Sequence, residues 1–469
     1  MQIGSLIEKL GFLSGLTTRS QTHAGGSAVR GTRLGLRATG LGASLLLAHA
    51  AASAQQPLPP AAPISAPSFN VPADVVAAYS TYHIGPIWFR NGPDSPAAAQ
   101  LAAILQRAPF DGFAEGPQLA ALVQSAASQV RLNPASAPAA EQVLSAAWVR
   151  YVQAVKKPTA GMIYAYSILK PHGTRTDEIL LTAAAAPSLA TYLSTTSAVN
   201  PVYQELRDAA WADAQASGNV TPDPRLLANL DRARSIPARG RFVLVDSGNQ
   251  RLTMFEDGRP VDSMRIIVGT NELPTPLISS MMYYITYNPY WHAPDHLVRK
   301  TIAPTYLRQG IKYLKSHGYH VIDEWSMSAK EIDAASVDWK AAAAGTTHLL
   351  VRQDPGPLNS MGNLKFPFDN PEGIYLHDTP NKDLFGKQVR NLSNGCVRVE
   401  DARRFGRWLL GGQDPVAPGS DPETAVKLPQ GVPVILTYLT AHLVDGKLTY
   451  ADDFYGWDKA GPPQVAQAN

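Results

Sequence analysis

The spacing of apolar residues changes its period once along the chain, near residues 237–240, and this change limits the folds that the chain can adopt. Between residues 71 and 236 the chain is rich in alanine, and its apolar residues recur at the spacing of amphipathic helices. From residue 240 to about residue 440, apolar and polar residues alternate as they do in β-strands. We therefore expect the α+β class, with an N-terminal all-helical scaffold domain at 71–236 followed by a β-rich domain at 240–440.

The β-rich domain is expected to contain a long insertion between its strands. The clearest helical patterns are residues 97–106, 118–127, 139–155 and 401–410, and the clearest strand patterns are residues 241–246, 250–256, 263–268, 281–288 and 432–438. Residues of about 289–350 are too many for a simple connection, so we expect an inserted lid or capping segment, with a helical piece at residues 328–332. Residues 441–469 are expected to form a C-terminal strand and tail.

The N-terminus has the pattern of a bacterial export signal. Arginines at positions 30, 33 and 37 precede a short apolar run, and Ala52-Ser-Ala54 supplies small residues for cleavage. We expect a signal peptide at residues 1–54 and, at residues 55–70, a tether too rich in proline and alanine to pack. The apolar run is shorter than the roughly 18 residues of a membrane helix. We therefore expect a soluble periplasmic protein without a permanent membrane anchor.

The net charge excludes two classes of partner. The whole chain has a formal charge of +3, but residues 1–54 hold five basic side chains against one acid, so the rest of the chain has a net charge of −1. A nearly neutral chain offers no broad electrostatic attraction to nucleic acid or to an anionic membrane. We expect neither as a partner.

Cys396 is the only cysteine of the chain. In an oxidising compartment structural cysteines occur in pairs, so a single thiol is typical of a reactive or intermolecular role. The alternative is a buried cysteine that acts as a small hydrophobic residue. A redox role is disfavoured because the sequence has no Cys-X-X-Cys pair.

His377 is the histidine best placed to act on this thiol. A thiol needs a base, because the thiolate is the strong nucleophile, and histidine is its usual partner. His377 ends the apolar, strand-like run 373–377, and Cys396 follows in a second turn. Two adjacent strand ends bring such side chains together. The alternative is a histidine whose ring is satisfied by local backbone groups.

Two neighbours of the thiol support this interpretation. Gly395 permits a backbone conformation in which its N–H and that of Cys396 point at a developing oxyanion. Arg398, two residues beyond the thiol, faces the same side on an extended segment and is suited to bind a carboxylate. The alternatives are an ordinary glycine turn and a salt bridge from Arg398 to Glu400 or Asp401.

Two further groups of residues give weaker signals. Tyr290, Trp291 and His292 lie beside the insertion, where they either line a cleft or belong to a buried core. His317 and His320 are close in sequence, but no third ligand accompanies them. We expect no metal site.

Residues 373–380, 384–385, 389–390 and 393–398 form one block of motifs around His377 and Cys396. This block resembles the active site of the L,D-transpeptidases that have a YkuD-type catalytic domain. A second set of motifs, which resembles the large periplasmic YcbB-like branch, comprises residues 268–276, 288–291 and 355–362 with Lys365 and Phe366. The similarity covers essentially the whole chain after the signal.

The resemblance implies an acyl-transfer site without a metal or an organic cofactor. It implies Cys396 as the nucleophile, His377 as general base and acid, and the backbone of Gly395 as part of an oxyanion hole. The substrate-binding residues that it implies are Arg398, Tyr375, Asn394 and Trp291. Many relatives carry a histidine where this chain has Asn394.

The implied function is that of a peptidoglycan L,D-transpeptidase, a cysteine acyltransferase of cell-wall biogenesis and cell shape. Stem tetrapeptides would serve as donor and acceptor, and a thioester at Cys396 would lead to a 3-3 cross-link. The alternatives are an L,D-carboxypeptidase or hydrolase, an enzyme that attaches proteins to peptidoglycan or releases them, and a non-catalytic cell-wall-binding scaffold.

Overall fold

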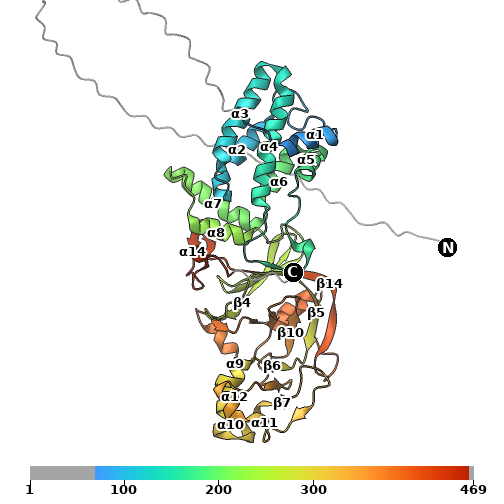
Figure 1. Ribbon diagram of the computed structural model, residues 1–469, viewed down its shortest axis with the longest axis vertical. Helices are drawn as coiled ribbons and strands as arrows, with labels where there is room; N and C mark the ends of the chain where they lie inside the picture. Colours follow the sequence, from blue (N-terminus) through green and yellow to red (C-terminus); the bar gives the residue numbers. More distant parts are fainter. Residues whose placement is uncertain (1–68, 464–469) are drawn as a thin grey trace, which may run out of the picture. The chain divides into compact units, whose positions relative to one another are not determined.

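The computed structural model describes residues 69–463. The export signal expected at residues 1–54 lies outside the described residues, and so do nearly all of the expected tether and residues 464–469. Within residues 69–463, no helix combines the length and the apolar character needed to cross a membrane. The expected α+β class is confirmed, because a helical region precedes a β-rich domain (Figure 1).

The helical region contains the helices that its apolar spacing predicts, together with five further ones. Its helices are α1 (Ala73–Thr81), α2 (Pro96–Arg107), α3 (Gly116–Leu132), α4 (Ala137–Val155), α5 (Thr176–Ala185), α6 (Leu189–Ala198), α7 (Pro201–Ser217) and α8 (Pro224–Ala233). Local sequence signals mark the first turn of some of these helices. At α2, the Ser95 hydroxyl accepts the backbone N–H of Ala98, and Pro96 occupies the first turn, where a proline leaves no donor unsatisfied.

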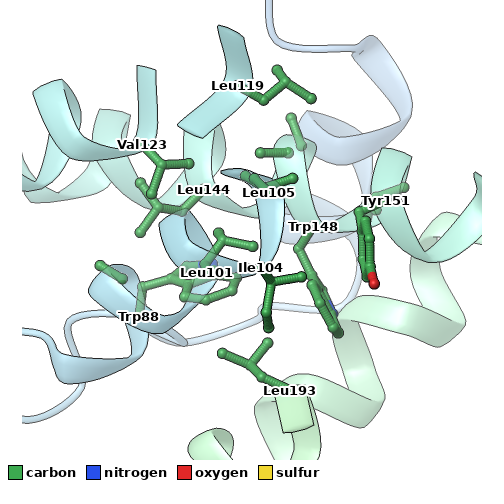
Figure 2. Close-up of a cluster of buried hydrophobic side chains, with 14 of the residues drawn as sticks. Trp88, Leu101, Ile104, Leu105, Leu119, Val123, Leu144, Trp148, Tyr151 and Leu193 are labelled. Atoms are coloured by element: carbon green, nitrogen blue, oxygen red, sulfur yellow. The ribbon is translucent and has the colours of Figure 1, made fainter. Parts of the chain in front are cut away.

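The helical region has its own hydrophobic core. Trp148 and Tyr151 of α4 are fully buried and stack with their ring centroids 5.6 Å apart. Leu101 and Leu105 of α2 and Leu144 of α4 belong to the same buried cluster (Figure 2). Burial of one such side chain contributes roughly 1.5–3 kcal/mol. Packing of these faces, rather than helix propensity alone, therefore stabilises the helices.

The β-rich domain is built on one large sheet that closes on itself. Its strands are β2 (Phe242–Asp246), β3 (Arg251–Glu256), β4 (Arg259–Gly269), β5 (Ile278–Tyr287), β10 (Leu364–Pro367), β11 (Tyr375–His377), β12 (Asn391–Ser393), β13 (Val397–Val399) and β14 (Thr424–Thr437). The strand order is β5-β10-β11-β13-β4-β3-β2-β14, and β14 pairs again with β5, while β12 pairs with β4. This order makes β11 and β13 neighbours, although residues 378–396 separate them in sequence.

The core of the β-rich domain determines which side chains face away from it. Phe366, Leu376 and Val397 are fully buried in this core, and so is Phe405 of the helix α13 (Ala402–Leu409). Successive side chains of a strand point to opposite faces of the sheet. The residues on either side of Phe366, Leu376 and Val397 therefore lie on the other face, which carries the candidate site.

The residues between β5 and β10 form a small folded unit, which we call the insertion unit. Its elements are β6 (Trp291–Ala293), α9 (Asp295–Leu297), a π-helical turn (Val298–Ile302), α10 (Ala303–Gln309), α11 (Ile311–His317), β7 (Tyr319–Ile322), β8 (Glu331–Ile332), α12 (Trp339–Ala344) and β9 (Leu350–Gln353). The strands pair in the order β6-β9-β7-β8. Val298, Trp339 and Val351 are buried in a separate core. The insertion is thus a folded body rather than a simple loop.

The helical piece expected at residues 328–332 is wrong. Glu331–Ile332 form the short strand β8, which pairs with β7. The backbone N–H of Asp323 donates to the carbonyl of Lys330 (3.1 Å), and the N–H of Lys330 donates to the Asp323 side chain (2.8 Å). These two hydrogen bonds close a hairpin, and pairing with β7 outweighs the local helical preference of the sequence.

Two further segments extend the β-rich domain. The strand β1 (Ile163–Tyr164) lies in the range expected to be all-helical and pairs in parallel with β5. At the C-terminal end, β15 (Ala441–Val444) and β16 (Lys447–Tyr450) form a hairpin, which α14 (Trp457–Ala460) follows. Tyr455 donates its hydroxyl to the carbonyl of Gly269 at the end of β4 (2.7 Å). The C-terminal segment therefore supports the strand end that adjoins the candidate site.

Candidate active site

Strand β11 carries the histidine nominated by the sequence and lies between β10 and β13. In the antiparallel pair of β10 and β11, Lys365 lies opposite His377, and in the parallel pair of β11 and β13, His377 lies beside Arg398. Residues paired across neighbouring strands direct their side chains to the same face. The His377 ring therefore lies in one row between a lysine and an arginine.

Cys396 directly precedes β13 and continues this arrangement one step along the strands. It is two residues before Arg398, so it faces the same side, and the strand register places it beside Tyr375. The rings of Tyr375 and His377 meet edge-on, with centroids 5.8 Å apart. Four of the nominated residues, Tyr375, His377, Cys396 and Arg398, thus share one face of the sheet.

The thiol of Cys396 is half-buried and protonated at neutral pH. Its sulfur lies 3.8 Å from the carbonyl oxygen of Gly373, to which it donates a weak hydrogen bond. Burial raises the pKa of the thiol, and the smaller opposing effects of Tyr375, Lys365 and Arg398 do not cancel this rise. The thiol therefore needs a base before it reacts as a thiolate.

His377 is a neutral base at physiological pH. The side chain is 6% exposed, and its Nδ1 donates to the backbone carbonyl of Asp378 (2.5 Å), which leaves the lone pair on Nε2. Burial, followed by the positive charge of Arg398, lowers the pKa of His377 to about 4. An unprotonated imidazole with a lone pair on Nε2 is the form that accepts a proton.

Proton transfer between these two groups requires a small rearrangement. Within residues 69–463, no hydrogen bond joins the Cys396 thiol directly to His377, because the thiol contacts the carbonyl of Gly373 instead. Catalytic hydrogen bonds are often long before substrate binds. Direct proton transfer between the thiol and Nε2 would therefore require the thiol to turn away from Gly373.

Gly395 determines the shape of the turn before the cysteine. Its φ of +106° lies in a region that L side chains rarely adopt, and a Cβ atom there would approach the Cδ1 of Ile374 to 3.1 Å. In the described part of the chain, the backbone N–H groups of Gly395 and Cys396 have no protein acceptor. They are therefore able to donate to a developing oxyanion.

A buried threonine holds this turn in place. The Thr275 side chain is 1% exposed; its hydroxyl donates to the carbonyl of Gly395 (2.7 Å) and accepts the backbone N–H of Gly269 (2.9 Å). The hydroxyl of Ser393 donates to the carbonyl of Cys396 (2.6 Å). The turn is thus attached to the end of β4 and also closed by its own side chain.

Replacing Thr275 with valine tests this attachment. Valine keeps the shape but leaves the buried N–H of Gly269 and the buried carbonyl of Gly395 unpaired, and each loss costs about 1–3 kcal/mol. We expect Thr275→Val to lower the free energy of unfolding by about 2–4 kcal/mol in a urea titration. Thr275→Ser keeps the hydroxyl and should lose far less. Equal stability of the valine variant and the parent protein would show that the threonine does not hold the turn.

Arg398 keeps unused hydrogen-bonding capacity beside the thiol. Its Nε is buried and has no hydrogen-bond partner within residues 69–463. The carboxylates considered as its alternative partners bind other arginines, since Glu400 pairs with Arg265 and Asp401 pairs with Arg404. A guanidinium in this state is suited to an incoming carboxylate.

Two other nominated residues are placed differently. Trp291 of β6 packs against Tyr319 (ring centroids 6.3 Å apart) and the core of the insertion unit, so the structure does not bring it to the thiol. Asn394 is exposed in the turn before Gly395. The side chain after Trp291, that of His292, points to the opposite face of β6, where the centre of its ring lies 4.7 Å from that of Trp325.

The paired histidines of the insertion unit have local roles. His320 contacts the carboxylates of Glu331 (2.9 Å) and Asp354 (2.8 Å), and His317 contacts the carbonyl of Tyr313 (2.9 Å). Within residues 69–463, no cluster of side chains has the composition of a metal site.

Sequence reasoning assigned no role to two cations near the site. Lys365 shares the row of His377, and Arg352 of β9 lies opposite His292. Partial burial, followed by the charges of Lys365 and Arg352, lowers the pKa of His292. No local sequence pattern relates them to Cys396, because the relation arises only from strand pairing.

Two parts of the chain match the models of known domains. Residues 240–418 match an L,D-transpeptidase catalytic domain of the YkuD type, and residues 73–209 match a scaffold domain. The first match contains all of the residues that share the face around Cys396.

Individual relatives are distant. A Haemophilus influenzae protein, provisionally named an L,D-transpeptidase, is 28% identical over 322 residues, which are 66% of this chain and 64% of that protein. The chain thus spans less than two-thirds of the length of that relative. Two solved structures share 14% identity: an Enterococcus faecium L,D-transpeptidase mutant (43% of this chain and 51% of that chain, TM-score 0.21) and an L,D-transpeptidase from Mycobacterium smegmatis (42% and 58%, TM-score 0.21). These TM-scores are too low to support any conclusion about the fold. The family resemblance rests on the two matched domain models.

Proposed function

We propose, from the premise that this chain carries an L,D-transpeptidase catalytic domain of the YkuD type behind a scaffold domain in a YcbB-like arrangement, that it forms 3-3 cross-links between peptidoglycan stem peptides. The observation that carries the proposal is the meeting of Cys396, His377 and Arg398 on one face of two paired strands. In this proposal the reaction runs through a thioester at Cys396.

Acylation begins when the sulfur of Cys396 attacks the carbonyl carbon of the third residue of a donor tetrapeptide. His377 Nε2 takes the thiol proton as the C–S bond forms, and the backbone N–H groups of Gly395 and Cys396 hold the oxyanion. The intermediate then collapses: the C–N bond to the terminal D-alanine breaks, and the imidazolium gives its proton to the leaving amine. The products are a thioester and free D-alanine.

Deacylation transfers the acyl group to an acceptor. The side-chain amine of diaminopimelate on a second stem attacks the thioester, and His377 accepts a proton from that amine as the new amide bond forms. The C–S bond breaks, and the sulfur of Cys396 recovers a proton from the imidazolium. With water as acceptor the product is a tripeptide, and with a protein amine it is a wall-attached protein, so the same acylation serves the alternative functions.

The charges around the thiol favour a neutral thiol and imidazole before reaction, and they stabilise the thiolate once the proton has moved. Before reaction, the thiol and the imidazole are both neutral, because burial opposes either charge alone. Once the proton moves, the thiolate and the imidazolium attract each other, and Lys365 and Arg398 stabilise the negative sulfur. Arg398 is also the proposed ligand of a substrate carboxylate, since its guanidinium lacks an internal counter-ion in the described residues.

The proposal includes export to the periplasm. The arginines and the short apolar run before Ala54 support it, because this pattern is typical of a cleaved secretory signal. A stem peptide is accessible only to a protein that reaches the cell wall. The expected contribution is to cell-wall biogenesis and cell shape.

Product analysis tests the proposed function. The purified protein is incubated with diaminopimelate-containing tetrapeptide muropeptides, and the products are identified by mass spectrometry. We expect a cross-linked dimer and free D-alanine. Tripeptide without dimer would favour the carboxypeptidase, and the absence of every product and of any covalent adduct would contradict an acyltransferase.

A further inference from the structure

Two cations, Lys365 of β10 beside the thiol and Arg352 of β9 in the insertion unit, form no ion pair with a carboxylate within residues 69–463. Both side chains are half-buried. The Nε of Arg352 is, in addition, buried without a hydrogen-bond partner in the described residues. Each cation lies over an aromatic ring, which replaces only part of the hydration lost on burial, so this arrangement becomes more favourable when an anion binds.

Arg352 is oriented by the insertion unit. It lies opposite His292 in the pair of β6 and β9, and its guanidinium lies over the Tyr290 ring, 4.1 Å from the ring centre. Stacking on a ring fixes the plane of the guanidinium and leaves the N–H groups at its edge free to donate. Tyr290 is itself held, because its backbone N–H donates to Glu423 (2.9 Å).

Lys365 approaches the same position from the sheet. Its Nζ lies 4.8 Å from the centre of the Tyr375 ring, in the row that contains His377. The charge of Lys365 acts both on Cys396 and on His292, whereas that of Arg352 acts on His292. Asn288, two residues before Tyr290, donates its backbone N–H to the carbonyl of Asn363, two residues before Lys365 (3.2 Å), so the pairing of β5 with β10 brings Lys365 and the Tyr290 ring that carries Arg352 to one part of the site.

Three internal carboxylates lie in this neighbourhood. Asp354 and Glu331 both contact His320, which lies opposite Arg352 in the pair of β7 and β9. The charge of Glu423 acts on Tyr375, and its Oε1 accepts the backbone N–H of Tyr290. In the described residues none of the three forms an ion pair within 4.0 Å with Lys365 or Arg352.

We propose that Arg352 and Lys365 form a second carboxylate-binding subsite, on the opposite side of His377 from Arg398. This subsite holds a free carboxylate of a stem peptide. This inference rests on the proposed function and extends it. The edge of a guanidinium binds one or both carboxylate oxygens, and the ammonium group adds a point charge to the same ligand. A carboxylate bound there contacts β9 and β10 together, so the insertion unit becomes part of the substrate site.

Both donor and acceptor stems carry free carboxylates, and direct binding distinguishes them. The full chain with Cys396→Ala, which prevents turnover, is titrated calorimetrically with a donor tetrapeptide and, separately, with an acceptor tripeptide. Each peptide is also used with its free carboxylates converted to amides. We expect amidation of one peptide to weaken its binding about 10-fold, and that peptide identifies the stem that the subsite holds.

Arg352→Gln and Lys365→Gln are then made in the same background. Each should bind the free-acid peptide about 10-fold more weakly than the parent and bind its amide equally well. Arg308→Gln and Lys312→Gln remove the same charges from exposed positions of the insertion unit and should change neither affinity. Arg352→Lys, which keeps the charge, should recover part of the lost affinity.

Three outcomes would overturn the subsite. If both glutamine variants bind every peptide as the parent does while the unmodified enzyme still cross-links, the subsite is absent and the proposed function stands. If affinity falls equally for free and amidated peptides, the variants have a structural defect rather than a lost carboxylate contact. If the Cys396→Ala chain binds neither peptide and the unmodified enzyme forms no acyl-enzyme, the proposed function fails together with the subsite.

Discussion

Cys396→Ala is expected to abolish acyl transfer, with the rate of product formation falling by at least about 10⁴-fold. Cys396 is the only cysteine in the chain, so no other thiol can replace it. The substitution removes the weak contact to Gly373 and the contact of the sulfur with Tyr375, and the free energy of unfolding should fall by about 1 kcal/mol. The measurement is the rate of dimer formation from tetrapeptide muropeptides, followed by mass spectrometry.

The variant also separates the enzyme from a non-catalytic scaffold. Tyr375 and Arg398 remain in Cys396→Ala, so the variant should still bind stem peptides. Cys396→Ser serves as a matched control, because it keeps a hydrogen-bonding side chain of similar size but lacks the nucleophilicity of sulfur. If the alanine variant forms cross-links at the parent rate, the nucleophile lies elsewhere and the role assigned to Cys396 is wrong.

His377→Gln is expected to slow acylation by about 10²–10⁴-fold, which is the usual contribution of a general base. Glutamine fills a similar volume but cannot accept the thiol proton. The raised pKa of Cys396 makes this dependence strong, since few thiols ionise without a base. Rapid quenching followed by intact-protein mass spectrometry gives the rate of acylation. An unchanged rate would exclude His377 as the base.

The same variant has a second readout, the dependence of stability on pH. The pKa of His377 is about 4 in the folded protein and 6.5 without its environment, so the unfolded chain binds a proton between these values and the folded protein does not. Stability should therefore fall as the pH drops from 6.5 to 4, by about 3 kcal/mol from this group. His377→Gln should lose that part of the acid sensitivity. Urea titrations at pH 7 and pH 4 measure it.

Local patterns sufficed to predict much of the fold. Polar and apolar residues alternate from Arg251 to Met254, and this pattern predicts β3 within a residue. Apolar spacing likewise predicts α4 at residues 139–155. The prediction failed at residues 328–332, where pairing of β8 with β7 depends on residues 319–322 and on a hydrogen bond to Asp323. β1 was missed because two residues form no pattern and the strand exists only beside β5.

For the candidate site, too, the sequence predicts some features, whereas others arise only from strand pairing. The chemistry of a lone thiol and a histidine is visible in the sequence, and the structure places His377 at the end of β11 and Cys396 directly before the neighbouring strand β13. The positions of Lys365 and Arg352 depend on the register of β10 with β11 and of β9 with β6, which no short motif encodes. Trp291 is the opposite case, a residue that the sequence nominated but that the structure places away from the thiol. The alternation along β6 directs its side chain into the core of the insertion unit and directs His292 to the opposite face.

The central claim is that Cys396 accepts the acyl group of a stem peptide. The most direct test is to mix the protein with donor tetrapeptide alone, quench the reaction within seconds, and determine the intact mass and the modified residue. We predict an adduct equal to the donor minus one alanine, located on Cys396 and released by an added amine. Cross-linked product formed without any adduct on Cys396, or with the adduct on another residue, would contradict the claim.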